Sequence, residues 1–232
     1  MHAYKTPLFY EISWVVKLDN MKCILLFLVL TTTTAMSQTP TKYLALGDSY
    51  TIGESVTENE RWPVQLAEAL RKKGTIIEDP KIIATTGWRT DNLANAINIA
   101  RLKDEYNLVS LLIGVNNQYQ GKPIAQFTKE FEELLNTAIK LAGGKRENVF
   151  VVSIPDYGYT PFGKPKQEKI SKELDEYNNL TREIVKKYNI KYFYITDISR
   201  KGLTDPELVA EDGLHPSGKQ YGLWVDLILK GL

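Results

Sequence analysis

The stretch LVSLLI, residues 108–113, is a nearly continuous apolar run of the length of a strand. Because it lacks the alternation of polar and apolar residues seen in half-exposed strands, it predicts a strand that is buried on both faces. Four other short apolar runs lie before and after it, and longer segments separate them. The five predicted strands are Lys42–Gly47, Lys81–Thr85, Leu108–Ile113, Asn148–Ile154 and Lys191–Ile195.

The longer segments carry apolar residues at the spacing of amphipathic helices. A strand followed by a helix, repeated five times, implies a parallel sheet that is covered by helices on both sides. In such sheets ligands bind beyond the carboxyl ends of the strands, so chemically useful residues are expected directly after strands. The predicted helices are Trp62–Lys73, Asp91–Glu105, Pro123–Ala142, Gln167–Tyr188 and Gly218–Lys230.

The composition is that of one ordinary globular domain. The 232 residues carry a formal net charge of +1 and are 43% hydrophobic, which is typical of folded domains and not of disordered or fibrous chains. No segment gathers Lys or Arg with interleaved aromatic residues, as binding to a phosphate backbone requires. We therefore expect no nucleic-acid partner.

The N-terminal residues have the order of a secretory signal. Met21-Lys22 precedes an apolar run of roughly ten residues, and small residues follow up to Ser37. A helix that spans a bilayer needs about 20 apolar residues. We therefore expect cleavage after Ser37, a secreted or periplasmic protein, and no stable membrane anchor. The alternative is an N-terminal helix that is buried or that anchors the chain in a membrane.

Residues 1–37 are thus predicted to be a leader with the signal peptide Met21–Ser37, and residues 38–232 a single domain. Residues 1–20 precede the signal, and we interpret Met21 as the true start of the chain. The only cysteine, Cys23, lies inside the signal. The mature domain is therefore expected to lack disulfides, thiol catalysis and cysteine-bound zinc.

Only one histidine is available to the predicted domain. The sequence has two, and His2 lies in the leader, so any imidazole base must be His215. It follows Asp212 by three residues, and a carboxylate at that distance in a turn can orient the ring and fix its tautomer. The alternative is a surface histidine in a loop beside a helix cap.

Small polar residues follow three successive predicted strands. Ser49 follows the first strand within Gly-Asp-Ser, Gly87 follows the second, and Asn116 follows the third. A nucleophilic serine needs a sharp turn beside amide groups that point at the reacting oxygen, and these positions meet that need. Each of them is also compatible with an ordinary turn.

The order of these residues resembles the four marker blocks of the SGNH hydrolases, also called the GDSL esterase/lipase family, which include lysophospholipase-like esterases. The first block is present as ALGDSYTIG at residues 45–53, and the fourth as DGLHPSG at residues 212–218. The third block departs from the common Gly-x-Asn-Asp, because Asn117 stands in the last position. The resemblance extends from Lys42 to the C-terminus. The four marker residues are Ser49, Gly87, Asn116 and His215.

The resemblance implies a three-layer α/β/α sandwich with a five-stranded, mainly parallel sheet of the flavodoxin-like kind, and it implies a serine esterase that hydrolyses carboxylic esters. Ser49 would be the nucleophile, His215 the general base and then acid, and Asp212 the group that orients the ring. The N–H groups of Ser49 and Gly87 and the side chain of Asn116 would form the oxyanion hole. No metal or organic cofactor is implied.

Three aromatic residues on loops predicted to face the site are candidates for substrate binding, although they could equally pack the loops: Trp88, Tyr119 and Tyr157. The expected substrate is a small-molecule or glycan ester, namely a small acyl ester, a lysophospholipid or an acetylated carbohydrate. An acyltransferase acting to or from a glycan would use the same residues and is an alternative. A non-catalytic carbohydrate-binding module is a third alternative, against which the presence of Ser49 and His215 argues.

Overall fold

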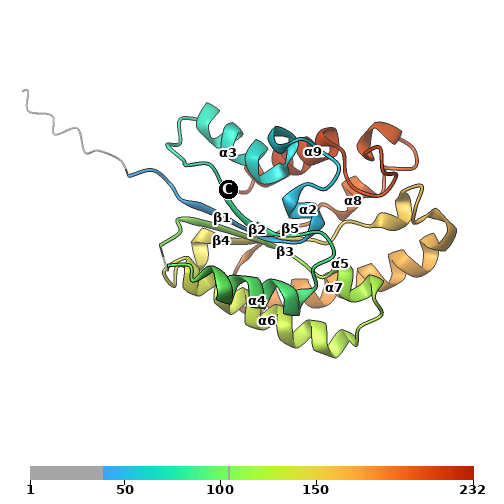
Figure 1. Ribbon diagram of the computed structural model, residues 1–232, viewed down its shortest axis with the longest axis horizontal. Helices are drawn as coiled ribbons and strands as arrows, with labels where there is room; N and C mark the ends of the chain where they lie inside the picture. Colours follow the sequence, from blue (N-terminus) through green and yellow to red (C-terminus); the bar gives the residue numbers. More distant parts are fainter. Residues whose placement is uncertain (1–38, 104) are drawn as a thin grey trace, which may run out of the picture. The chain divides into compact units, whose positions relative to one another are not determined.

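A five-stranded sheet lies at the centre of the structure, a computed structural model that describes residues 39–103 and 105–232. All neighbouring strands pair in parallel, in the order β2-β1-β3-β4-β5 (Figure 1). This is the flavodoxin-like order, in which the chain reverses direction across the sheet between β1 and β3. The strands are β1 (Tyr43–Gly47), β2 (Lys81–Ala84), β3 (Leu108–Leu112), β4 (Val149–Val152) and β5 (Lys191–Phe193).

Helices cover both faces of the sheet, so the predicted three-layer α/β/α sandwich is confirmed. Helices α3 and α9 lie on one face, and α4, α6 and α7 lie on the other (Figure 1). Three short helices, α2, α5 and α8, follow β1, β3 and β5. The bounds are α2 (Ser49–Ile52), α3 (Trp62–Lys72), α4 (Thr90–Ala100), α5 (Val115–Tyr119), α6 (Ile124–Leu141), α7 (Gln167–Lys187), α8 (Thr196–Ser199) and α9 (Gly218–Leu229).

Strand β3 lies in the middle of the sheet and is buried, as its apolar run predicts. Val109, Leu111 and Leu112 have no exposed surface. The one polar residue of the run, Ser110, is also fully buried, and its hydroxyl pairs with that of Tyr43 on β1 at 2.9 Å. Because each hydroxyl supplies the other with a partner, neither is left unsatisfied in the core.

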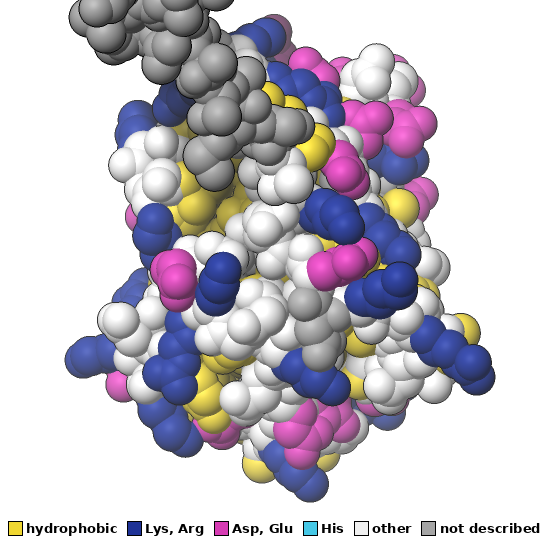
Figure 2. Space-filling model, turned by 90° about the vertical axis from the view of Figure 1, so that its left-hand side faces the viewer, with side chains coloured by type: hydrophobic (Ala, Val, Ile, Leu, Met, Phe, Trp, Pro, Cys, Tyr) yellow, Lys and Arg dark blue, Asp and Glu magenta, His cyan; other side chains and the backbone are white. Residues whose placement is uncertain are grey.

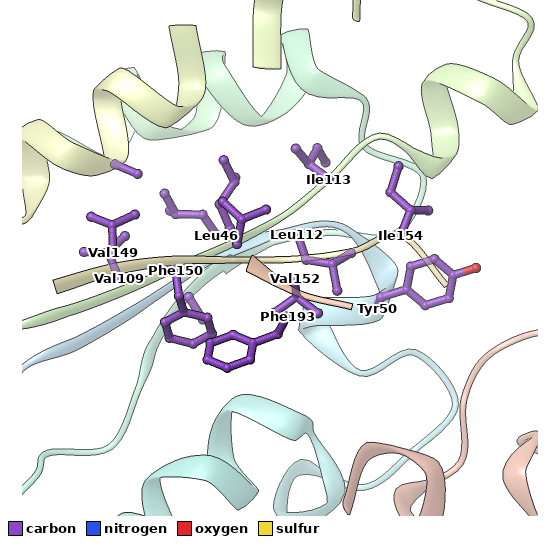
Figure 3. Close-up of a cluster of buried hydrophobic side chains, with 14 of the residues drawn as sticks. Leu46, Tyr50, Val109, Leu112, Ile113, Val149, Phe150, Val152, Ile154 and Phe193 are labelled. Carbon is purple, nitrogen blue, oxygen red and sulfur yellow. The ribbon is translucent and has the colours of Figure 1, made fainter. Parts of the chain in front are cut away.

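Apolar side chains leave the sheet on both faces. Ile113 and Ile154 point to one side, and Phe150 and Phe193 point to the other (Figure 3). The rings of Phe150 and Phe193 meet edge to face with centroids 5.5 Å apart, and Trp62 of α3 meets Phe150 at 6.3 Å. The sheet is therefore packed between two apolar layers, which hold in place the strand ends from which the loops begin.

The element boundaries agree with the predictions to within two residues, with one exception. The helix predicted over Asp91–Glu105 is α4, which ends at Ala100 because Arg101 adopts a left-handed backbone conformation with φ of 45°. The short helices α2, α5 and α8 were not predicted, because four or five residues are too few to show a helical period.

No helix within residues 39–103 and 105–232 is both long and apolar enough to cross a membrane. The predicted leader and signal peptide lie outside the described residues. On the face shown in Figure 2, Lys and Arg side chains are interspersed with Asp and Glu side chains.

Candidate active site

A cavity of about 280 Å³ opens beyond the carboxyl ends of the strands. The four marker residues from separate parts of the sequence line it, and so do two of the three aromatic candidates. The structure thus brings together residues that follow β1, β2 and β3 and residues that precede α9. The predicted residues around the cavity are Ser49, Gly87, Asn116, His215, Tyr119 and Tyr157.

The turn after β1 places Ser49 at the cavity. A Cβ atom at Gly47 would lie 2.1 Å from Oγ1 of Thr51 and 2.6 Å from the carbonyl oxygen of Leu112, so only glycine lets the strand end this close to α2 and β3. Asp48 caps α2 by accepting a hydrogen bond from the N–H of Tyr50 at 3.1 Å. Ser49 is then the first residue of the helix, where backbone N–H groups have no acceptor within the helix.

The carboxylate of Asp212 holds the ring of His215. Oδ2 of Asp212 lies 2.6 Å from Nδ1 of the ring, while Oδ1 accepts the N–H groups of Leu214 and His215, both at 2.9 Å. Burial raises the pKa of Asp212, but the hydrogen bonds from His215, Ser55 and the backbone outweigh it and lower the pKa to about 2. The group is therefore ionised at neutral pH and can stabilise a protonated ring.

The ring of His215 is also fixed from its side. Tyr50 meets it edge to face, with centroids 5.8 Å apart. No hydrogen bond joins Ser49 Oγ to this ring in the described part of the chain, although both side chains line the same cavity. Hydrogen bonds of this kind are often long in unliganded enzymes and tighten when substrate binds. The pairing of Ser49 with His215 stays a prediction.

Asn116 connects the loops that follow β2 and β3. Its Nδ2 donates to the carbonyl oxygen of Trp88 at 3.0 Å, which orients the amide beside Gly87. Gly114 precedes it with φ of 128°, and a Cβ atom there would lie 2.5 Å from the ring of Phe127. Glycine thus lets α5 begin directly after β3, with Asn116 in its first turn. Trp88 itself packs against the core and does not line the cavity.

Asn117, which stands at the departure from the common third block, binds Thr90. Its Oδ1 accepts the N–H of Thr90 at 3.1 Å, and its Nδ2 donates to the hydroxyl of Thr90 at 2.7 Å. That hydroxyl in turn donates to Glu130 of α6. The fully buried amide of Asn117 therefore clamps the start of α4 to α5.

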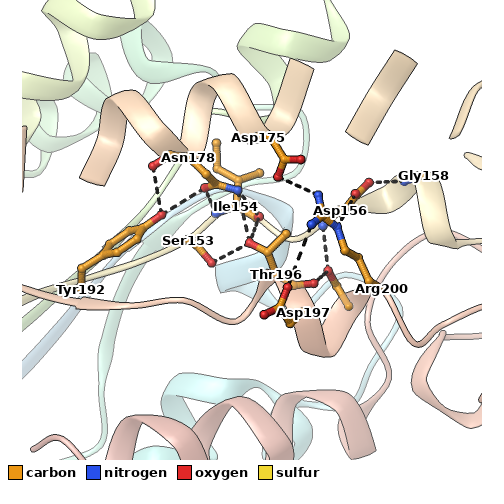
Figure 4. Close-up of polar contacts among 11 residues, drawn as sticks. Ser153, Ile154, Asp156, Gly158, Asp175, Asn178, Tyr192, Thr196, Asp197 and Arg200 are labelled. Carbon is orange, nitrogen blue, oxygen red and sulfur yellow. Dashed lines mark hydrogen bonds and ion pairs between the residues drawn. The ribbon is translucent and has the colours of Figure 1, made fainter. Parts of the chain in front are cut away.

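An ion-pair network holds the loop that carries Tyr157. Arg200 binds the buried Asp156 at 3.0 Å and Asp175 of α7 at 2.7 Å, and Asp156 also accepts the N–H of Gly158 at 2.9 Å (Figure 4). Tyr157 lies in the chain between Asp156 and Gly158, which this hydrogen bond joins. The ion pair of the buried Asp156 with Arg200 therefore holds the loop that carries the aromatic wall of the cavity. Removal of either partner would break this pair and disturb this loop.

Ser55 is a site residue that sequence analysis does not identify. Its hydroxyl donates to Oδ2 of Asp212 at 2.7 Å, and its backbone has φ of 66°. The neighbouring Glu54 accepts a hydrogen bond from Thr86 beside Gly87. The segment after α2 therefore contacts both the Asp212 loop and the loop after β2. No local pattern singles it out, because Asp212 lies 157 residues away in the chain.

Comparison with known proteins shows the family of the chain. The sequence profile of the GDSL-like Lipase/Acylhydrolase family matches residues 45–223. An arylesterase of Vibrio mimicus is 27% identical over 191 residues, which cover 78% of this chain and 83% of that protein. The chain belongs to the GDSL-like Lipase/Acylhydrolase family and is a hydrolase of the esterase type.

Solved structures share the fold at low sequence identity. The psychrotrophic esterase EstA from Pseudoalteromonas sp. superposes with a TM-score of 0.62 at 17% identity, covering 82% of this chain and 94% of that one. The acetyl xylan esterase AlAXEase superposes with a TM-score of 0.65 at 17% identity, covering 82% of this chain and 99% of that one.

Replacing Ser55 by Ala should lower kcat/KM for p-nitrophenyl acetate roughly tenfold, since a hydrogen bond to a charged group contributes about 1.5–3 kcal/mol and about 1.4 kcal/mol is a factor of ten. Ser55→Gly is the control, because it also removes the hydroxyl but relieves the positive φ. Both variants should lose activity alike. Unchanged kinetics in Ser55→Ala would show that this hydroxyl does not support Asp212.

The buried carboxyl of Asp48 should make stability depend on pH. Its Oδ2 has no hydrogen-bond partner among residues 39–103 and 105–232, and burial raises its pKa from the ordinary 3.8 to about 7. In the unfolded chain the group ionises near pH 4, so ionisation opposes folding increasingly as pH rises from about 4 to about 7. Asp48→Asn removes that charge, so it should be stabilising above pH 7, by up to about 4 kcal/mol, and nearly neutral at pH 4.

Urea unfolding of the two proteins at pH 4, 6 and 8 measures this difference. A gap between them that grows with pH is the expected result. A gap of the same size at all three pH values would mean that Asp48 does not titrate in the predicted way.

Proposed function

We propose that this esterase hydrolyses carboxylic esters with a short acyl group through a covalent intermediate on Ser49. The observation that carries the proposal is the meeting of four residues from separate loops at one cavity, with the ring of His215 oriented by Asp212 at 2.6 Å. A serine hydroxyl is a poor nucleophile unless a base removes its proton during attack, and His215 lines the cavity beside it.

In the proposed first step, Ser49 Oγ attacks the ester carbonyl carbon while His215 takes its proton. The carbonyl oxygen becomes negative, and the N–H groups of Ser49 and Gly87 and the amide of Asn116 are the donors that stabilise it. The carbon–oxygen bond to the alcohol then breaks, and His215 returns the proton to the leaving alcohol. Water attacks the acyl-enzyme by the same steps, which releases the acid and restores the serine.

The size and lining of the cavity support a small acyl group. Its volume of about 280 Å³ lies just below the range of roughly 300–1,000 Å³ that is usual for sites holding drug-sized ligands. Tyr50, Val115 and Leu214 give it an apolar wall. An acetyl group, a short chain or an aryl ring fits this space better than the chain of a lysophospholipid. The arylesterase relative and the acetyl xylan esterase of similar fold agree with a small acyl ester.

Ser49→Ala and His215→Ala should each lower kcat for p-nitrophenyl acetate by several powers of ten, on the order of 10⁶ in comparable triads. Ser171→Ala is the matched control, because this serine lies on α7, makes no hydrogen bond within the described residues and does not line the cavity. Purified wild-type protein and variants are compared at neutral pH. Substantial turnover by Ser49→Ala would refute the acyl-enzyme, and faster hydrolysis of the palmitate than of the acetate ester would refute the short acyl group.

We also propose that the segment Met21–Ser37 exports the enzyme, on the basis of its charged start, its short apolar run and the small residues that follow. N-terminal sequencing of the exported protein should begin at Gln38. A product that still begins at Met1 or Tyr4 would contradict both the signal and the interpretation of Met21 as the start.

A further inference from the structure

A second pocket, of about 370 Å³, adjoins the catalytic cavity. Tyr119, Tyr157 and Phe162 line both spaces, so a ligand can reach from one to the other along these three rings. Their centroids lie 6.2–6.4 Å apart, which is the distance of rings in mutual contact. The remaining walls come from α5, from α7 and from the loop between β4 and α7.

The rim of this pocket exposes aromatic surface. Tyr119 is 59% exposed and Phe162 is 50% exposed, whereas Tyr157 beneath them is buried. Large apolar side chains grouped beside a site are more often part of a binding surface than are single exposed ones. The two rings are tilted by 45° to each other and form an angled platform at the entrance of the pocket.

The lining of the same pocket also includes polar side chains, with both donors and acceptors. The amide of Gln118 donates to Glu173 at 2.6 Å and accepts the hydroxyl of Tyr157 at 3.0 Å. Lys169 lies 3.7 Å from Glu173 on the next turn of α7. Lys166 adds a cation that forms no ion pair with the described residues. The hydrogen bond between Gln118 and Glu173 holds these two side chains together, and all four polar groups keep further hydrogen-bonding capacity.

An aromatic platform above paired donors and acceptors matches a pyranose ring. The C–H faces of the ring can pack on Phe162 and Tyr119, while its hydroxyl groups both donate and accept. A fatty chain would cover the buried amide of Gln118 and the carboxylate of Glu173 without giving them new partners, which is costly. A quaternary ammonium group would meet two lysines, and the three rings contact one another too closely to enclose it.

We propose that the pocket lined by Gln118, Phe162, Lys166, Lys169 and Glu173, here called the sugar subsite, binds one pyranose ring of an O-acetylated oligosaccharide. The acetyl group on the neighbouring ring then enters the catalytic cavity, so the alcohol released when the acetyl group is transferred to Ser49 is a sugar hydroxyl. The proposal rests on the proposed ester hydrolysis and names the alcohol part of its substrate. It implies that an oligosaccharide ester binds more tightly than its single-ring fragment.

The test compares acetylated xylotriose with an acetylated methyl xyloside, which has one ring and cannot fill both spaces. Wild-type protein should show a KM roughly tenfold lower for the trimer, as one or two net hydrogen bonds would give. The double variant Lys169→Ala/Glu173→Ala should abolish most of this tenfold advantage. Lys166→Ala, which changes a residue before α7, should also reduce the difference in KM between the trimer and the single-ring ester.

The matched control is Lys172→Ala/Glu176→Ala. It removes the same two charges from the same helix, but these residues are exposed and line neither space. The trimer should keep its advantage in this variant. An advantage that is absent in wild type, or equally large in all variants, overturns the sugar subsite. In that case wild-type protein would still hydrolyse p-nitrophenyl acetate with Ser49, and the proposed ester hydrolysis would be unaffected. Wild-type protein that does not hydrolyse p-nitrophenyl acetate would instead refute the proposed ester hydrolysis.

Discussion

The close contact of β1, α2 and β3 at Gly47 is the constraint on which the site depends. Residue 47 has no room for a side chain, because Thr51 and the Leu112 carbonyl occupy the space of a Cβ atom. The chain must therefore turn at once into α2, with Ser49 as its first residue. Since β1 and β3 lie at the point where the sheet order reverses, this turn opens into the crevice where doubly wound sheets bind ligands.

Hydrogen bonds between side chains and loops hold the remaining residues around this turn. Asn116 and Asn117 fasten the loop after β2, and Ser55 fastens the loop of Asp212. Such contacts hold loops in place although the loops have no regular secondary structure. Hydrogen-bond donors on loops held in this way can keep their positions while charge develops on a substrate. The buried carboxyl of Asp48 has one oxygen without a partner in the described part of the chain, and we expect the same turn to carry a local cost in stability.

Short patterns in the sequence predict the sheet, its parallel pairing and the positions of the four marker residues. These patterns are an apolar run, a helical period and a small residue at a strand end. They do not predict the roles of Ser55 and Trp88, because each role depends on contacts between distant loops. Ser55 meets Asp212 across 157 residues, and Trp88 turns its carbonyl, not its ring, toward the site. The early end of α4 is likewise set by the backbone of Arg101, which apolar spacing does not reveal.

Helix α5 lines both the cavity at Ser49 and the neighbouring pocket. Asn116 lies in its first turn beside Gly87, Asn117 clamps the start of α4, and Gln118 and Tyr119 line the second pocket. Because successive residues of a helix point in different directions, five residues are enough to reach both spaces. A displacement of α5 would therefore move Asn116 and Tyr119 together. That coupling gives a physical reason for Glu173 and Thr90 to anchor the helix from opposite sides through Gln118 and Asn117.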